Sequence, residues 1–222
     1  MNSQSFIEVM ESRVLMSAAP TLFSTAVKAD RMVIRADLLK FQSDLLLSDA
    51  KLLVDEQAIK HNLAKGDTSL VAPFATLHSD VKAMNLALRE ERLTESANAL
   101  ADESTIRLDI VQILKDRHNS SAETADHAKL LADRITLQNA LVAGLDARIA
   151  TRTADQATIS ADTAAIVTAA NNDSAATAGL QTAVATFSTD RIARLNTITT
   201  DLQTIETARN TLVNDLTAEQ GT

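Results

Sequence analysis

The chain contains no Cys, no Trp and no Tyr, and only two Pro and four Gly among its 222 residues. Without cysteine, neither a disulfide scaffold nor a nucleophilic thiol is available. β-Sandwiches and barrels need aromatic and β-branched strands joined by many Gly- or Pro-containing turns, which this composition cannot supply. Hydrophobic residues still make up 45% of the chain, and their periodic spacing excludes intrinsic disorder. The composition therefore predicts an all-α protein of long helices.

The charge balance is acidic. The 21 Lys and Arg residues face 29 Asp and Glu residues, which gives a formal net charge of −8. A chain of this sign repels phosphate backbones, and no basic patch is segregated along the sequence, so nucleic acid is excluded as a partner. Because no run of 18 apolar residues occurs, we expect no membrane-spanning helix.

The first 22 residues form a separate block with a sequence pattern of their own. Glu11-Ser12-Arg13 is followed by Val14-Leu15-Met16 and then by Ser17-Ala18. This block resembles the LEPR-XLL N-terminal domain of planctomycete-type bacteria, whose pattern is roughly Leu-Glu-Pro-Arg-x-Leu-Leu followed by Ser-Ala. Identical residues stand at Glu11, Arg13, Leu15, Ser17 and Ala18, whereas Met10, Ser12 and Met16 replace Leu, Pro and Leu.

The resemblance implies a cellular location but no activity. In that family the segment heads exported and surface proteins of diverse content, so Glu11, Arg13 and Leu15 would belong to a sorting motif and the protein would be exported to the cell surface or extracellular space. The alternative interpretation of residues 1–22 is an ordinary chain terminus with a short apolar anchor.

Residues 23–222 are predicted to form one long-helix domain. Polar, turn-forming residues interrupt the helical pattern at 65–69, 118–121 and 171–174, which leaves segments of about 24–64, 73–117, 121–170 and 174–218. Ser120 and Glu123 have the spacing of a capping box, and Asn172, Asp173 or Ser174 could cap the last segment. Segments of about 45 residues joined by short loops predict four antiparallel helices in an up-down-up-down bundle, with an extended coiled coil as the alternative.

Apolar residues recur at helical spacing in every segment. In the first segment, Leu39, Leu46 and Leu53 widen the stripe, which favours a bundle over a two-stranded seam. In the second half Ala and Thr supply 33 of the 73 residues from Ala150 onward, so those helices need partners along their length. The residues predicted to form helix interfaces are Leu38, Phe41, Leu45, Leu145, Ile149, Ile159, Leu195, Ile198, Leu202, Ile205 and Leu212.

No pattern of catalytic, cofactor-binding or metal-ligating residues is found. Glu123 and His127 lie four residues apart, which is typical of a surface pair on a helix. Gly66 lacks the strand and the companion glycines of a phosphate-binding loop. We therefore expect a non-enzymatic structural or interaction protein of the cell surface or matrix. We expect its copies to associate into a homo-oligomer or a polymer, with fibres as one form. The alternative is an amphipathic bundle that binds lipid or membrane surfaces, which the acidic charge and the absence of Trp disfavour.

Overall fold

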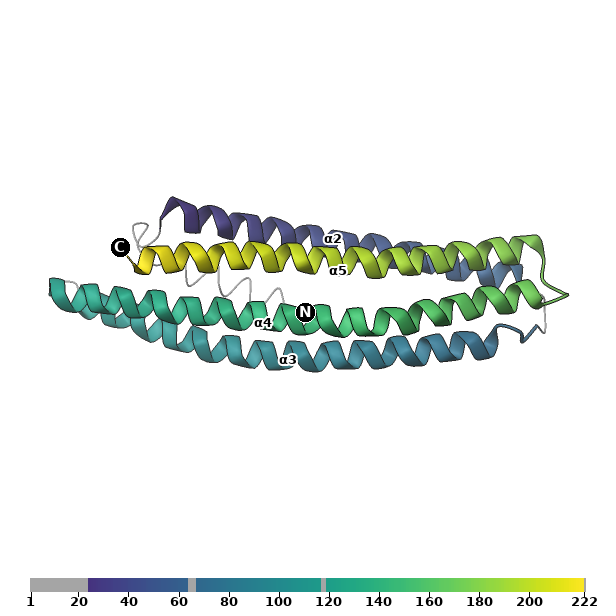
Figure 1. Cartoon of the computed structure of the whole chain (residues 1–222), viewed down its shortest axis with the longest axis horizontal. Helices are drawn as coiled ribbons and strands as arrows, with labels where there is room; N and C mark the ends of the chain where they lie inside the picture. The colour runs from purple at the N-terminus through teal and green to yellow at the C-terminus, as the bar shows by residue number, and fades with distance from the viewer. Residues whose placement is uncertain (1–23, 64–66, 117–118, 222) are drawn as a thin grey trace. The chain divides into compact units, whose positions relative to one another are not determined.

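The structure, a computed structural model, describes residues 24–63, 67–116 and 119–221. Within these ranges it contains four long helices and no strand, which confirms the all-α prediction (Figure 1). The helices begin and end within four residues of the predicted segments. They are α2 (Thr25–Asn62), α3 (Val71–Asp116), α4 (Ser120–Asn172) and α5 (Ala178–Gln220).

Contacts between α2 and α5 follow antiparallel order. The backbone N–H of Ser24 donates to Glu219 Oε1 at 2.7 Å. Further along α2, Asp49 Oδ1 accepts a hydrogen bond of 2.8 Å from Arg194 Nε. Residue numbers therefore rise along α2 as those of its partners fall along α5.

The same order holds between α4 and α5. Gln156 Nε2 donates to Asn196 Oδ1 at 2.8 Å, and Arg209 donates to Gln138 Oε1 at 2.8 Å. Because these contacts lie within one chain, the helices fold back on one another as an up-and-down helical bundle.

Packing divides the chain into two compact units. Among the described residues, unit 1 comprises 24–36, 90–146 and 205–221, and unit 2 comprises 37–89 and 147–204. All four helices contribute to each unit, because the division cuts across each helix.

Each unit has its own hydrophobic core. In unit 2 the rings of Phe74 and Phe187 lie 5.5 Å apart, and buried leucine, isoleucine and alanine side chains surround them. The core of unit 1 contains Ala99, Ile106, Ile113, Leu130, Leu137 and Leu141. Such long, close-packed apolar seams stabilise helices whose Ala- and Thr-rich composition gives little burial per residue.

Two of the predicted helix caps are corrected. Helix α4 begins at Ser120, so Ser120 is not its cap, and Asn119 Oδ1 accepts the N–H of Ala122 at 3.5 Å. Helix α5 begins later than predicted, and its cap is Thr177, whose Oγ1 accepts the N–H of Leu180 at 3.1 Å. Several residues in both stretches can cap a helix, so the capping residue depends on where tertiary packing ends the loop.

The corrected cap of α5 can be tested by alanine substitution. Thr177→Ala removes the acceptor for the Leu180 N–H, and we expect the free energy of unfolding to fall by about 1 kcal/mol. Ser174→Ala, in the same loop, should change it by less than ~0.5 kcal/mol. Urea unfolding of both variants checks this, and an equal loss in both would show that Thr177 is not the dominant cap.

Candidate functional site

The predicted interface residues are all buried or half-buried. Eight of them are buried: Phe41, Leu145, Ile159, Leu195, Ile198, Leu202, Ile205 and Leu212. The other three are half-buried: Leu38, Leu45 and Ile149. The structure brings Ile159 and Leu195 together in the core of unit 2. The residues predicted to form a sorting motif, Glu11, Arg13 and Leu15, lie outside the described residues.

The exposure of three leucines on α2 contradicts one inference from the sequence. Leu39, Leu46 and Leu53 were expected to widen the buried stripe, but they are exposed, and Leu46 keeps 72% of its surface. The buried stripe of α2 in unit 2 is formed instead by Phe41, Leu52 and Ile59. The helix therefore carries two apolar stripes, and only one of them is covered.

The uncovered stripe of α2 is apolar over several turns. Residues spaced by three, four and seven positions share one face of a helix, and the members of this stripe have that spacing. In unit 2 we call it the α2 face, and it consists of Leu39, Ser43, Leu46, Leu47, Ala50, Leu53 and Val54, all of them exposed.

Helix α3 has a comparable uncovered stripe in unit 1. Leu93 and Leu108 on this helix are 61% and 68% exposed. We call this stripe the α3 face, and it consists of Leu93, Ala97, Leu100, Ser104, Leu108 and Val111. Among the described residues, every exposed large hydrophobic side chain belongs to α2 or α3.

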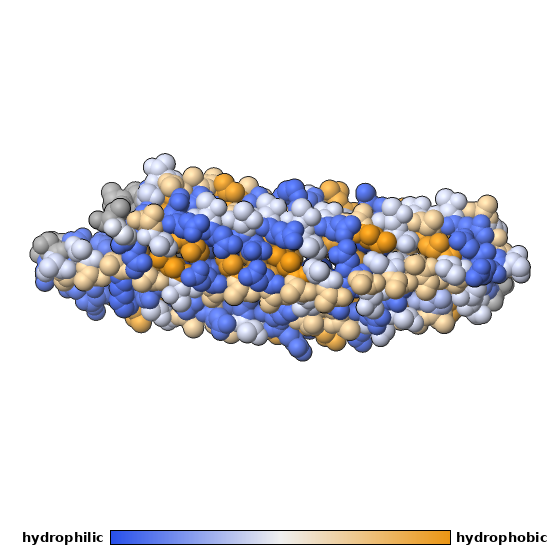
Figure 2. Space-filling model, in the orientation of Figure 1, coloured by the Kyte–Doolittle hydropathy of each residue, from blue (hydrophilic) through white to orange (hydrophobic). Residues whose placement is uncertain are grey.

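The exposed positions of α4 and α5 differ from the α2 and α3 faces, because they are occupied mainly by Ala, Thr and Asn. Many of these threonines donate their hydroxyl to the carbonyl four residues earlier, as Thr186 does to Thr182 O at 3.0 Å and Thr204 to Thr200 O at 3.0 Å. These hydroxyls already have partners within their own helix. On the face of the molecule in Figure 2, hydrophilic and pale surface predominates and hydrophobic residues form separate patches.

Two lysines link helices inside the units. In unit 2, Lys40 pairs with Asp44 of its own helix at 2.8 Å and with buried Asp201 of α5. These hydrogen bonds, that to Asp201 first, raise the pKa of Lys40 and keep it charged. The Lys40–Asp201 pair thus neutralises a buried carboxylate that would otherwise be costly.

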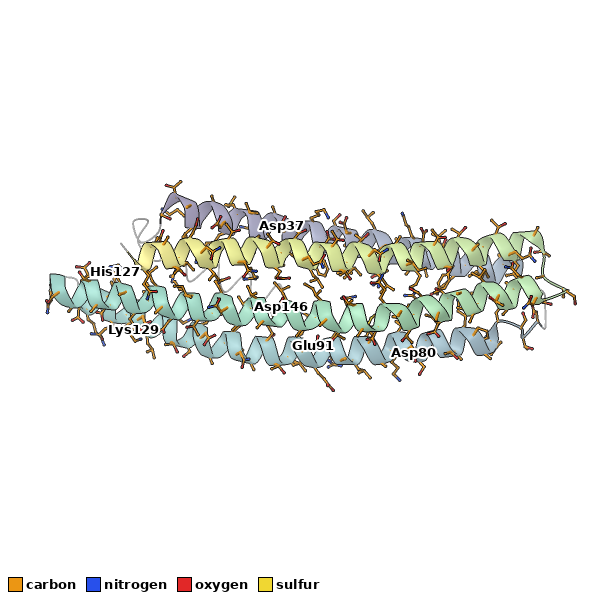
Figure 3. The ribbon with its side chains drawn as sticks, in the orientation of Figure 1. Asp37, Asp80, Glu91, His127, Lys129 and Asp146 are labelled. Carbon is orange, nitrogen blue, oxygen red and sulfur yellow. The ribbon has the colours of Figure 1, made fainter. Side chains whose placement is uncertain are left out.

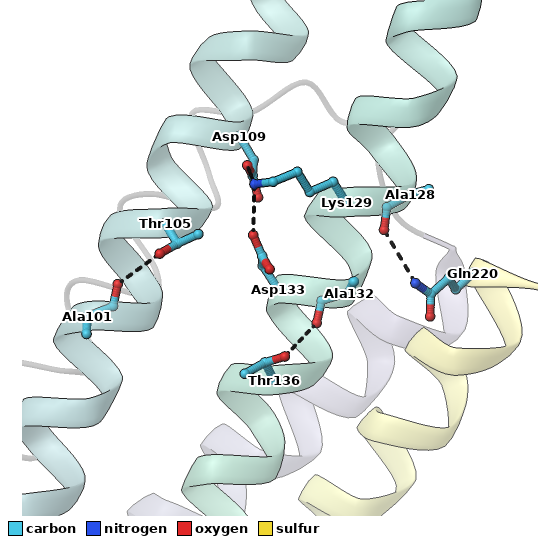
Figure 4. A network of polar contacts seen from close by, with 9 residues as sticks. All are labelled: Ala101, Thr105, Asp109, Ala128, Lys129, Ala132, Asp133, Thr136 and Gln220. Carbon is cyan, nitrogen blue, oxygen red and sulfur yellow. Dashed lines mark hydrogen bonds and ion pairs between the residues drawn. The ribbon is translucent and has the colours of Figure 1, made fainter.

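Lys129 makes the equivalent link in unit 1. It lies two residues after His127 near the start of α4 and pairs with Asp109 of α3 and with Asp133 at 3.2 Å (Figures 3 and 4). In Figure 4 the ammonium group lies between the two carboxylates. The sequence shows Lys129 and Asp133 as a pair at helical spacing, but it carries no sign of the cross-helix partner Asp109.

Pairs of carboxyl groups also meet across the helices. Burial and the neighbouring Asp190 raise the pKa of Asp55, which shares a side-chain hydrogen bond with that residue. Burial and the neighbouring Asp146 likewise raise the pKa of Glu206. The other carboxyl groups with a raised pKa and an acidic neighbour are Asp30, Asp109, Asp126 and Asp162.

Arginines on the apolar stripes have several environments. The guanidinium of Arg191 lies 5.5 Å from the ring centre of Phe187, and burial lowers its pKa. Arg209 is buried and donates to Gln138, and Arg152 is buried as well. At Arg191 and Arg209 the observed contacts are with this chain's own helices.

The described residues were searched for metal-ligating groups. Within them, no group of three or more His, Asp or Glu side chains is placed to hold a metal ion. Glu123 and His127 form a partly exposed pair at 3.8 Å. None of the four helices combines the length and the apolar character needed to cross a membrane. The α2 and α3 faces are therefore the features that most call for a functional explanation.

Comparison of the chain with protein-family models, with curated proteins and with solved structures found no match.

Proposed function

We propose that this protein is a non-enzymatic structural protein of the cell surface or extracellular matrix that self-associates through its helices. The observation that carries this proposal is the pair of apolar faces on α2 and α3, which stay exposed while α4 and α5 present Ala, Thr and Asn. The exported location rests on the resemblance of residues 1–22 to a family of exported proteins.

The energetics favour covering these faces. Burying a leucine side chain fully stabilises an assembly by about 1.5–3 kcal/mol, and several exposed leucines lie on each helix. Two apolar faces on different helices let one copy bind two others, so growth can continue into a polymer or fibre. Direct contact through these faces brings few charges together, although each copy carries a net charge of −8.

A lipid or membrane surface is the alternative partner, because exposed leucines also favour an apolar solvent. Amphipathic helices that lie on membranes usually carry Lys and Arg beside the apolar stripe and Trp or Phe within it. The α2 face contains neither aromatic residues nor arginine. Two lysines border it: Lys40 is paired with two carboxylates, and Lys51 lies near the carboxyl group of Asp55. Self-association therefore fits the composition of this face better.

The effect of Leu46→Glu on association tests the proposal. The side chain is 72% exposed, so the substitution should leave the fold intact while placing a carboxylate in any contact made by the α2 face. We expect the affinity between copies to fall at least ~100-fold, since the loss exceeds about 2.7 kcal/mol. Sedimentation velocity over a range of chain concentrations measures this.

Thr200→Glu on the outward side of α5 is the matched control, since it adds the same charge at an exposed position. We expect Thr200→Glu to associate like the unchanged chain. If the unchanged chain is monomeric at every concentration and salt, self-association is wrong. Co-flotation with neutral or anionic vesicles under those conditions would favour the lipid alternative.

A further inference from the structure

The α2 face alternates large and small residues at regular spacing. Leu39, Leu46 and Leu53 recur every seven residues, and between them lie the small residues Ser43 and Ala50. This order places a leucine and a small residue in turn along one side of the helix, with Leu47 and Val54 beside them. Such a face offers both projecting side chains and the recesses that accept them.

The spacing is self-complementary under a twofold axis. If a second α2 runs antiparallel and the axis passes between positions 44 and 45, Leu46 of each copy lies opposite Ser43 of the other. The same axis places Leu39 of each copy opposite Ala50. Large side chains then meet small ones along the contact, which allows the helices to approach closely.

We infer that the α2 face binds the α2 face of a second copy of this chain in an antiparallel, twofold-symmetric pair. This inference rests on the proposed self-association and names the surface and geometry of one of its contacts.

The α3 face is a poorer partner for the α2 face. The α3 face repeats the same four-three-four spacing, with Leu93, Ala97, Leu100 and Ser104. In the antiparallel register that sets leucines against small residues, however, Leu53 and Val54 would lie opposite Glu90 and Arg89 of the other copy. Burying those two charges against apolar side chains is costly, whereas in the α2 pair Val54 lies opposite one charged residue, Arg35, and Leu53 lies opposite Ala36.

The expected contact is reversible. From Leu39 to Val54 the α2 face extends over ~22 Å of helix. This is short for a specific interface, which commonly covers about 800 Å² on each partner. We therefore expect association that depends on chain concentration in the micromolar range.

Disulfide cross-linking tests the geometry directly, because the chain has no cysteine of its own. In Ser43→Cys the two thiols lie near the twofold axis, offset by ~4.5 Å along the helices, which a disulfide can bridge. In Ala50→Cys the two thiols are offset by ~16 Å, beyond the reach of a disulfide. Both positions are exposed, so neither substitution should disturb the fold.

The full-length variants are oxidised at a concentration where the unchanged chain associates and are analysed on non-reducing gels. We expect covalent dimers from Ser43→Cys and none above background from Ala50→Cys. Dimers from Ala50→Cys would indicate a parallel pair and overturn the inference. Failure of both variants to cross-link while the chain still associates would also overturn it and would leave self-association standing, whereas a chain that never associates removes both proposals.

Discussion

Replacing Leu195 by alanine is expected to lower the free energy of unfolding by about 2–5 kcal/mol. Leu195 is 2% exposed and belongs to the core of unit 2, so its removal leaves a cavity among packed side chains. For a chain of this length, that loss corresponds to a fall in the melting temperature of roughly 10 °C. Urea unfolding followed by far-UV circular dichroism measures the change.

Leu46→Ala is the matched control, since it deletes the same atoms from a position that is 72% exposed. At a concentration where the chain is monomeric, we expect this substitution to lower the free energy of unfolding by less than ~0.5 kcal/mol. Comparable losses at both positions would mean that Leu46 is covered within one chain. That outcome would remove the basis for an α2 face that other copies can bind.

Lowering the pH from 7 toward about 4 is expected to stabilise the protein. Carboxyl groups with a raised pKa hold their proton more tightly in the folded chain than in the unfolded chain. Their contribution to stability is complete below the ordinary pKa of about 4 and is lost as the pH rises through the raised values. At neutral pH the paired carboxylates repel one another, which lowers the free energy of unfolding.

Two other carboxyl groups determine how far the pH can be lowered before the protein loses stability again. A hydrogen bond from Lys40 lowers the pKa of Asp44, and the backbone N–H of Ser69 lowers that of Asp67. Their stabilisation is present above the ordinary pKa and is lost as the pH falls through the lowered values. Stability should therefore be highest at about pH 4–5, as measured by urea unfolding across the pH range. A maximum at pH 7 or above would contradict the raised pKa values.

Asp55→Asn isolates one pair of this set. The amide can donate to Asp190 without a shared proton, so we expect stability at pH 7 to rise by about 1 kcal/mol and the pH dependence to weaken. Asp44→Asn removes a carboxylate that pairs with Lys40 and should lower stability at the same pH. If both substitutions shift stability in the same direction, carboxyl repulsion is not the cause.

Much of the fold could be predicted from residue patterns. The scarcity of Gly and Pro and the three polar interruptions are enough to predict four long helices with boundaries correct to within four residues. Local chemistry supports this prediction, because helix propensity and apolar spacing act over a few residues. The capping residues were less predictable, since the loops before α4 and α5 contain several suitable side chains.

The contacts between distant residues could not be predicted in the same way. Asp109 with Lys129 and Asp55 with Asp190 depend on the register of one helix against another. One sequence by itself carries no signal of that register, since an acidic residue on a helix is expected to be an ordinary solvent-exposed charge. The acidic pairs therefore become visible only in the folded chain.

By itself, the sequence determined that this protein is built of long helices, where they break, and that both Phe41 and Leu46 lie on apolar stripes of α2. Only the tertiary structure decided that the stripe with Phe41 is buried and the stripe with Leu46 is exposed. The physical reason is that helical periodicity shows which residues share a face, whereas the packing of the other helices determines which face is covered.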